Sequence, residues 1–258
     1  MDPALEAPIL ALVWYGVFII SLTLHEAGHA FAAKLLGDPT AYLGGQVTLN
    51  PRPHIEREPI GTVLVPVISY TLPLLMGAQH GWMMGWASAP YNPHWAARFP
   101  RRAAWMAAAG PAANLLLAII ALLLIRLGMA AGFLASPQSI SDFAEVAVGA
   151  DGDPSVLSQF LSVLYMLNLI LMLFNLIPLP PLDGSAIVQL FMREETSQRW
   201  QDFMRQPGFA LVGLLIAWKL FSYISPGAVS VVTSFRGSLV DGWLGIGGLW
   251  AVGRLLMR

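Results

Sequence analysis

Residues 8–36 read PILALVWYGVFIISLTLHEAGHAFAAKLL and decide the fold. About 20 apolar residues are enough to cross a bilayer as a helix, so this stretch is long enough to span. Its C-terminal part carries His25, Glu26 and His29, ionisable groups that are costly at membrane depth and therefore indicate a function. The residues before it are acidic, and a small-residue cleavage site is missing, so we expect a retained span rather than a cleaved signal peptide.

Three further stretches have the same apolar character. They are residues 101–129, 156–179 and 208–224. Of the 258 residues, 56% are hydrophobic and only 11% are charged, which is far from the composition of soluble proteins. The sequence therefore predicts an all-α polytopic membrane protein with about 4–6 transmembrane helices.

Charge and cysteine content exclude other classes of protein and site. The formal net charge is -1 and the basic residues are scattered, which argues against a nucleic-acid partner. The chain has no cysteine, so disulfides, thiolate metal sites and cysteine nucleophiles are excluded. Any metal must be held by His, Asp or Glu, and the chain contains only 5 His.

Two stretches after the first span are irregular. Residues 37–58 combine glycines and prolines with alternating apolar residues, which predicts a connector of short strands and turns, a β-hairpin. Residues 60–79 are apolar but barely long enough to cross, and they contain Pro66 and Pro73. A single span, a kinked hairpin and a re-entrant dip are all compatible with them.

The sequence His25-Glu26-Ala27-Gly28-His29 has the pattern H-E-x-x-H within a helical run. Imidazoles four residues apart lie on one face of a helix and can share one ion, and the adjacent carboxylate can reach a water molecule. Zinc lowers the pKa of bound water from about 15.7 to about 7, so a carboxylate can take the proton during attack on a carbonyl. The alternative is a pair of helix histidines that only bond to their neighbours.

The third ligand is expected to be a carboxylate or an imidazole at the same depth. Most acidic residues lie in polar loops, which leaves Asp183 as the candidate. The prolines that precede Asp183 cannot continue a helix, so irregular backbone presents it, as membrane proteins tolerate where a cavity is lined. The alternative is a turn aspartate before Gly184 that caps the next helix.

Three motifs together resemble a known family. HEAGHA at 25–30 and NLIPLPPLDG at 175–184 resemble the site-2 protease family of intramembrane zinc metalloproteases, and GPAAN at 110–114 is similar to its glycine and asparagine motif. The motifs occur in the family's order. The resemblance covers about residues 8 to 190, and it applies to the short members that lack a PDZ insert.

The resemblance implies a role for individual residues. His25, His29 and Asp183 would bind one zinc ion per chain, and Glu26 would be the catalytic base. Asn175 would help to hold the substrate carbonyl or the developing oxyanion, as an amide donor can. The alternative for Asn175 is a hydrogen bond to the broken backbone beside it.

The small residues around Asn114 predict close helix packing, and Asn114 itself is expected to make a packing hydrogen bond rather than to line the cavity. We expect one integral membrane domain over residues 1–258. Its catalytic core would cover about 8–190 and its C-terminal helical extension about 205–258.

The resemblance implies hydrolysis of peptide bonds in or near transmembrane segments of membrane proteins. The partners would be a substrate with a transmembrane helix and the lipid bilayer. Such a helix must unwind locally, because internal hydrogen bonds otherwise occupy its carbonyls. The alternative is a non-enzymatic membrane protein that binds or transports a divalent metal ion.

The charges beside the first span predict an orientation. Lys34, Arg52 and Arg57 follow it, so the positive-inside rule places its C-terminal end in the cytoplasm. The active site is therefore expected toward the cytoplasmic side, in the bacterial plasma membrane. For Asp183 to meet the histidines, the span that ends at Leu176 must cross the membrane in the same direction as the first span, and the span between them, at 103–127, must cross in the opposite direction. This is possible only if residues 60–79 cross zero or two times, which predicts a proline-bent re-entrant hairpin.

Overall fold

The computed structural model describes residues 3–78, 81–137, 144–204, 206, 208–217 and 219–220. By its internal contacts the chain divides into two compact units, Met1–Gly213 and Leu214–Arg258. The candidate site lies in the first unit. Of the second unit the structure describes residues 214–217 and 219–220, which are helical. The predicted single domain stays a prediction.

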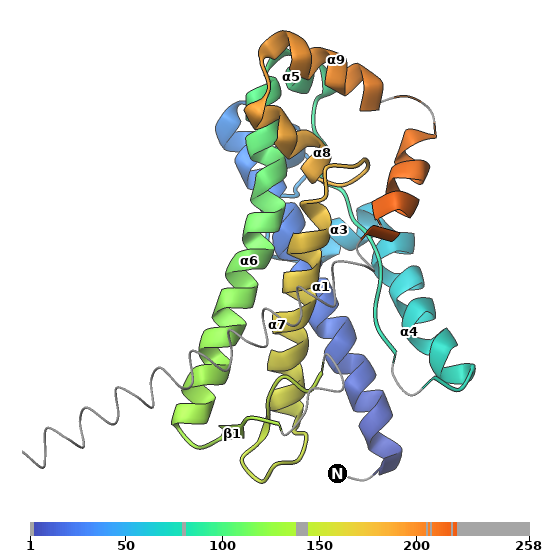
Figure 1. Ribbon diagram of the computed structural model, residues 1–258, viewed down its shortest axis with the longest axis vertical. Coiled ribbons are helices and arrows are strands. Elements are labelled where there is room, and N and C mark those ends of the chain that lie inside the picture. The colour runs from blue at the N-terminus through green and yellow to red at the C-terminus, as the bar shows by residue number, and fades with distance from the viewer. Residues whose placement is uncertain are drawn as a thin grey trace, which may run out of the picture. The chain divides into compact units, whose positions relative to one another are not determined.

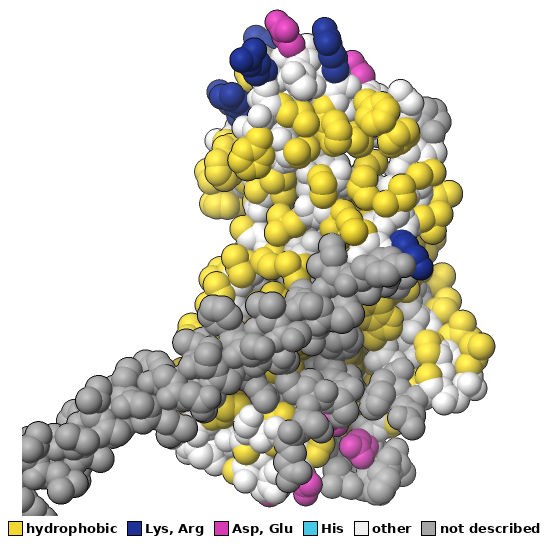
Figure 2. Space-filling model, viewed as in Figure 1, with side chains coloured by type: hydrophobic (Ala, Val, Ile, Leu, Met, Phe, Trp, Pro, Cys, Tyr) yellow, Lys and Arg dark blue, Asp and Glu magenta, His cyan; other side chains and the backbone are white. Residues whose placement is uncertain are grey.

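Within the described residues, three helices are long and apolar enough to cross a membrane. They are α1 (Pro3–Leu36), α6 (Pro100–Ala130) and α7 (Val156–Asn175), which run side by side in Figure 1. Hydrophobic side chains cover the middle of this unit in Figure 2, as expected for a surface that faces lipid. The predicted all-α polytopic membrane protein is confirmed. The fourth predicted span, 208–224, lies partly outside the described residues.

Small residues let α1 and α6 approach closely. A Cβ atom on Gly28 of α1 would lie 2.9 Å from the carbonyl oxygen of Ala109 on α6, which is closer than real Cβ atoms come. Small residues at such a crossing allow the backbones of membrane helices to pack. The predicted packing role of the small-residue run in α6 is therefore confirmed.

Local signals explain where α7 begins and ends. Ser155 forms a capping box with Ser158, in which each side chain bonds the other residue's backbone N–H. After Asn175 the prolines stop the helix, and the chain continues irregularly to α8 (Gly184–Ile187). A 3-10 turn (Val188–Phe191) and α9 (Glu194–Met204) follow.

The predicted β-hairpin connector is wrong. Residues 37–58, all of them described, hold the short helices α2 (Thr40–Leu43) and α3 (Arg52–Arg57). The backbone N–H groups of Thr40 and Arg52 donate to the side chains of Asp38 and Asn50, at 3.0 Å in both cases. Both bonds are Asx turns around Pro39 and Pro51, the N-cap residues of the two short helices, and here these turns outweigh the alternating pattern. Among the described residues the strands lie elsewhere, as the antiparallel pair β1 (Leu134–Ala135) and β2 (Val148–Gly149).

Residues 60–92 form a hairpin whose returning segment comes back beside Gly61. A π-helical turn (Ile60–Leu64) continues into α4 (Val65–Leu75), and the chain turns at Gly77, whose φ is 89°. An extended segment then returns, and the N–H of Trp86 donates to the carbonyl of Gly61 at 3.1 Å. The described residues form a hairpin, and its re-entrant place in the membrane stays a prediction. The predicted bend at a proline is wrong, because the left-handed glycine makes the turn and both prolines lie within the helix.

Two hydrogen bonds tie the start of α6 to the end of α1. The N–H of Asn92 donates to Asp38 Oδ2 at 2.7 Å, and Arg102 Nη1 donates to the carbonyl of Leu36 at 3.2 Å. α6 therefore starts at the level where α1 ends and runs in the opposite direction. α5 (Pro93–Arg98) lies between them in sequence, with Asn92 as its N-cap.

Candidate metal centre

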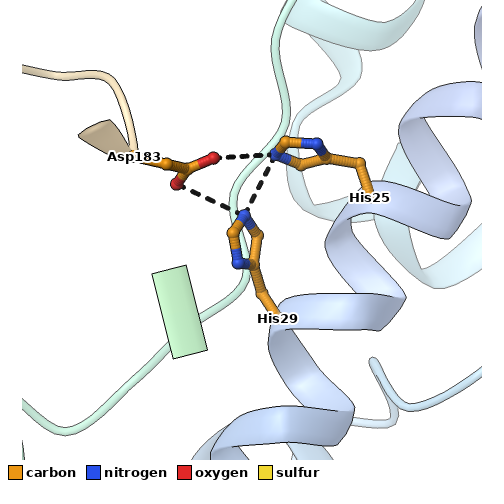
Figure 3. Close-up of side chains that lie close together, drawn as sticks. All are labelled: His25, His29 and Asp183. Carbon is orange, nitrogen blue, oxygen red and sulfur yellow. Dashed lines mark hydrogen bonds and ion pairs between the residues drawn. The ribbon is translucent and has the colours of Figure 1, made fainter. Parts of the chain in front are cut away.

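The two histidines of α1 and the loop before α8 bring three side chains together, as Figure 3 shows. His25 and His29 lie one turn apart, and their Nε2 atoms are 3.0 Å from each other. Asp183 places Oδ2 at 3.2 Å from Nε2 of His25 and Oδ1 at 3.3 Å from Nε2 of His29. The structure thus joins the three ligands predicted from stretches of chain that are far apart in the sequence.

Hydrogen bonds orient both imidazoles toward Asp183. Nδ1 of His29 donates to the backbone carbonyl of Met106 at 2.9 Å, and Nδ1 of His25 donates to Oδ1 of Asn114 at 2.5 Å. In a neutral imidazole the other nitrogen, Nε2, is then an acceptor. Metal-binding histidines are oriented in this way, by a partner on the nitrogen that does not bind the ion.

Lone-pair atoms of three residues, His25, His29 and Asp183, therefore face one another in a buried place. Oδ2 of Asp183 is buried, and within the described residues it has no hydrogen-bond donor. Acceptor atoms that face one another repel, and a buried polar atom without a partner costs free energy. A cation among these atoms would remove both costs. The side chain of Asp183 makes no capping bond to α8 in this part of the chain, which argues against the turn-aspartate alternative.

The spacing of these atoms fits a zinc ion. Zinc binds His nitrogen and carboxylate oxygen at about 2.0–2.2 Å in a tetrahedron, which separates neighbouring ligand atoms by about 3.3–3.6 Å. The two Nε2 atoms are 3.0 Å apart, and each lies 3.2 or 3.3 Å from its nearer Asp183 oxygen, which is close to this spacing.

Gly110 of α6 leaves room beside the two imidazoles. A Cβ atom there would lie 2.3 Å from Nε2 of His29 and 2.6 Å from Nε2 of His25. Both distances are too short for non-bonded atoms, so a side chain at this position would displace the ligands. Sequence reasoning assigned the small residues of α6 to helix packing and missed this second role of the glycine.

Glu26 is buried in α1, next to the first ligand, with 4% of its surface exposed. It is not one of the three grouped ligands. A buried carboxylate beside a metal site can accept a proton from water, the role that the H-E-x-x-H pattern predicts.

Asn175 is not brought into this group. Its Nδ2 donates to the carbonyl of Leu171 at 3.0 Å, one turn earlier in α7. This bond is to a carbonyl within α7 and not to the broken backbone that follows Asn175, so the alternative is not what the structure shows, and the role at the substrate carbonyl stays a prediction. Asn114 makes the expected packing hydrogen bonds, to Asn168 on α7 and to the carbonyl of Ser21 on α1, and it also contacts His25. The place of Asn114 in the GPAAN motif was the one feature of the sequence that pointed to this contact with His25.

Comparisons with known proteins agree with the site. A model of the family described as "Peptidase family M50" matches residues 14–215. "Putative zinc metalloprotease YwhC" of Bacillus subtilis (strain 168) is 38% identical over 193 residues, which are 73% of this chain and 74% of that protein. "Putative zinc metalloprotease Rip2" of Mycobacterium tuberculosis (strain ATCC 25618 / H37Rv) is 34% identical over 216 residues, 84% of this chain and 70% of that protein.

No solved structure matches the chain significantly. The family model covers α1, α6, α7 and the loop that carries Asp183, so it includes every residue of the candidate metal centre. The chain therefore belongs to peptidase family M50, the site-2 protease family that its three motifs resemble.

Proposed function

We propose that this protein is a zinc-dependent protease that hydrolyses peptide bonds in or near transmembrane segments of membrane proteins. The observation that carries the proposal is the convergence of His25, His29 and Asp183 around one point inside a bundle of apolar helices. The curated relatives carry the name of zinc metalloproteases, which agrees with this ligand set. A metal-ion carrier is not favoured by the family or by these names.

In this proposal each residue of the centre has one task. His25, His29 and Asp183 hold one zinc ion per chain, and Glu26 takes the proton from the attacking water and later gives it to the leaving amine. When bound, zinc lowers the pKa of water and polarises the carbonyl of the substrate. Asn114 and the carbonyl of Met106 keep the two imidazoles in place.

The substrate class follows from where the centre lies. His25 and His29 belong to the span Glu6–Leu36, so the bond to be cut must reach membrane depth. A soluble peptide would have to leave water to reach this depth, whereas a transmembrane segment already lies within the membrane. Its helix must unwind at the cleaved bond, because its carbonyls are otherwise held in internal hydrogen bonds. The proposed partners are such a membrane protein and the surrounding lipid.

The basic residues support a cytoplasmic orientation of the centre in a bacterial plasma membrane. Figure 2 shows most of the visible Lys and Arg side chains at the end of the unit where α5 and α9 lie in Figure 1. The exposed arginines next to α5, α6 and α9 are Arg98, Arg101, Arg102, Arg193 and Arg199. The positive-inside rule assigns such an end to the cytoplasm. The C-terminal end of α1, toward which the histidines lie, is at this end.

Proteoliposomes test this function. Purified full-length protein would be reconstituted with single-span membrane proteins extracted from the same membrane, and the fragments would be sequenced by mass spectrometry. We expect fragments whose new ends lie in or near transmembrane segments. Their formation should stop when a chelator removes zinc and resume when zinc is added back. Fragments that form equally well without zinc would contradict the proposal.

A further inference from the structure

A buried chain of hydrogen bonds leads from His25 on α1 through α6 to α7. Oδ1 of Asn114 accepts from His25 Nδ1, and Nδ2 of Asn114 donates to Oδ1 of Asn168 at 2.8 Å. Nδ2 of Asn168 donates to the carbonyl of Leu164 and to Oγ of Ser21, at 2.8 Å in both cases. Asn114, Asn168 and Ser21 are fully buried, with 0% exposure.

The backbone of α7 fixes the direction of every bond in this chain. The carbonyl of Leu164 can only accept, so Asn168 must turn its Nδ2 toward it. Oδ1 of Asn168 then faces Asn114, which must donate its own Nδ2. Oδ1 of Asn114 is left for His25, and because it can only accept, the proton must be on His25 Nδ1.

The two metal-binding histidines differ in how this proton is held. His29 donates to the carbonyl of Met106, which is backbone and cannot turn around. His25 donates to a side-chain amide. If this amide flipped by about 180°, it would present N–H to His25 in place of oxygen, and its shape would hardly change. A turned Asn114 would donate to His25 Nδ1 and would move the proton to Nε2, the atom that faces Asp183.

We propose that Asn168 is a positioning residue of the metal centre: it holds Asn114 in the one orientation that leaves His25 Nε2 free to bind the ion. The inference rests on the proposed zinc-binding function. In the described part of the chain Asn168 forms no hydrogen bond with His25, His29, Asp183 or Glu26, so its effect passes through Asn114. Asn114 has one further acceptor, the carbonyl of Ser21 at 3.4 Å, which is too long to hold the amide as firmly.

Zinc affinity in matched variants tests the proposal. Asn168→Leu keeps the size of the side chain but removes the acceptor of Asn114. Partners that orient a ligating histidine are worth about 10- to 100-fold in metal affinity, and we expect a loss of about tenfold, near the lower end of this range. The matched control is Ser21→Ala, which removes a bond of the same cluster but leaves the Leu164 carbonyl to fix Asn168. We expect its affinity to stay close to that of the wild type. Both are measured by competition with a chelator on the full-length protein in detergent.

The position of the proton gives a second readout. In zinc-free protein with 15N-labelled histidine, the NMR shifts of His25 should show a protonated Nδ1 in the wild type and a population with a protonated Nε2 in Asn168→Leu. A merely structural role of Asn168 would not move this signal. The wild-type spectrum requires no variant, so a proton found on His25 Nε2 there would contradict the proposal even if Asn168→Leu fails to fold.

Two results would overturn the proposal. One is an equal loss of zinc affinity in Asn168→Leu and Ser21→Ala, which would reduce the cluster to helix packing. The other is a wild-type His25 that carries its proton on Nε2. Neither readout uses a substrate, so a protein that binds zinc as expected but cuts nothing would contradict the proposed function and leave this inference intact.

Discussion

A Glu26→Gln variant is expected to lose peptide-bond cleavage and to keep its zinc. Glutamine has nearly the same size as glutamate but cannot accept a proton from water at neutral pH. A positioned general base contributes about 10²- to 10⁴-fold to a reaction rate, so cleavage should fall by at least about 10²-fold. The three ligands His25, His29 and Asp183 are unchanged, so the zinc content of the purified variant should equal that of the wild type. The rate is measured in proteoliposomes with one cleaved substrate.

The matched control for this variant is Glu56→Gln. Glu56 is an exposed carboxylate that pairs with Arg52 at 2.7 Å on α3, and it lies outside the metal group. Exposed ion pairs contribute little, so both cleavage and zinc content should be unchanged. A Glu26→Gln variant that cleaves as fast as the wild type would rule out the assigned base.

An Asp183→Ala variant is expected to lose zinc and, with it, all activity. Removing this carboxylate leaves two imidazoles, whereas catalytic zinc sites in proteins use three protein ligands. Loss of an outer partner already weakens metal binding about 10- to 100-fold, so loss of a ligand should weaken it by more than about 100-fold. Chelator competition measures the affinity, and the zinc-dependent rise in the unfolding temperature should disappear in the same variant.

Asp38→Asn is the control for Asp183→Ala. Asp38, which lies just after the end of α1, is also a buried aspartate. Its oxygens, however, accept from the backbone N–H groups of Thr40 and Asn92. This variant should bind zinc as the wild type does, although it should unfold at a lower temperature. Unchanged zinc affinity in Asp183→Ala would remove this residue from the ligand set.

The grouping of the three candidate ligands could be predicted from sequence because local geometry fixes most of it. Four residues along a helix always place two imidazoles on one face, so His25 and His29 needed only a helical setting. Asp183 could be identified because prolines exclude a regular helix before it and because few acids lie in apolar sequence. The hairpin at residues 60–79 could be expected from the direction in which the neighbouring spans must run.

Features that depend on contacts between distant segments could not be predicted. The link from Asn114 to His25 depends on the rotation of α6 against α1, which a sequence pattern does not specify. The space that Gly110 leaves beside the imidazoles arises from the same packing. In residues 37–58, the Asx turns of Asp38 and Asn50 precede two short helices in place of strands, and the strength of such turns relative to an alternating pattern depends on the surroundings.

All the predictions above depend on one zinc ion bound by His25, His29 and Asp183. X-ray absorption at the zinc edge of the purified full-length protein is the direct test of this ligand set. We expect one zinc per chain with two imidazole nitrogens and further oxygen ligands at about 2.0–2.2 Å, and no sulfur at about 2.3 Å. A spectrum with fewer than two imidazoles, or a protein that holds no zinc after purification with zinc present, would contradict it.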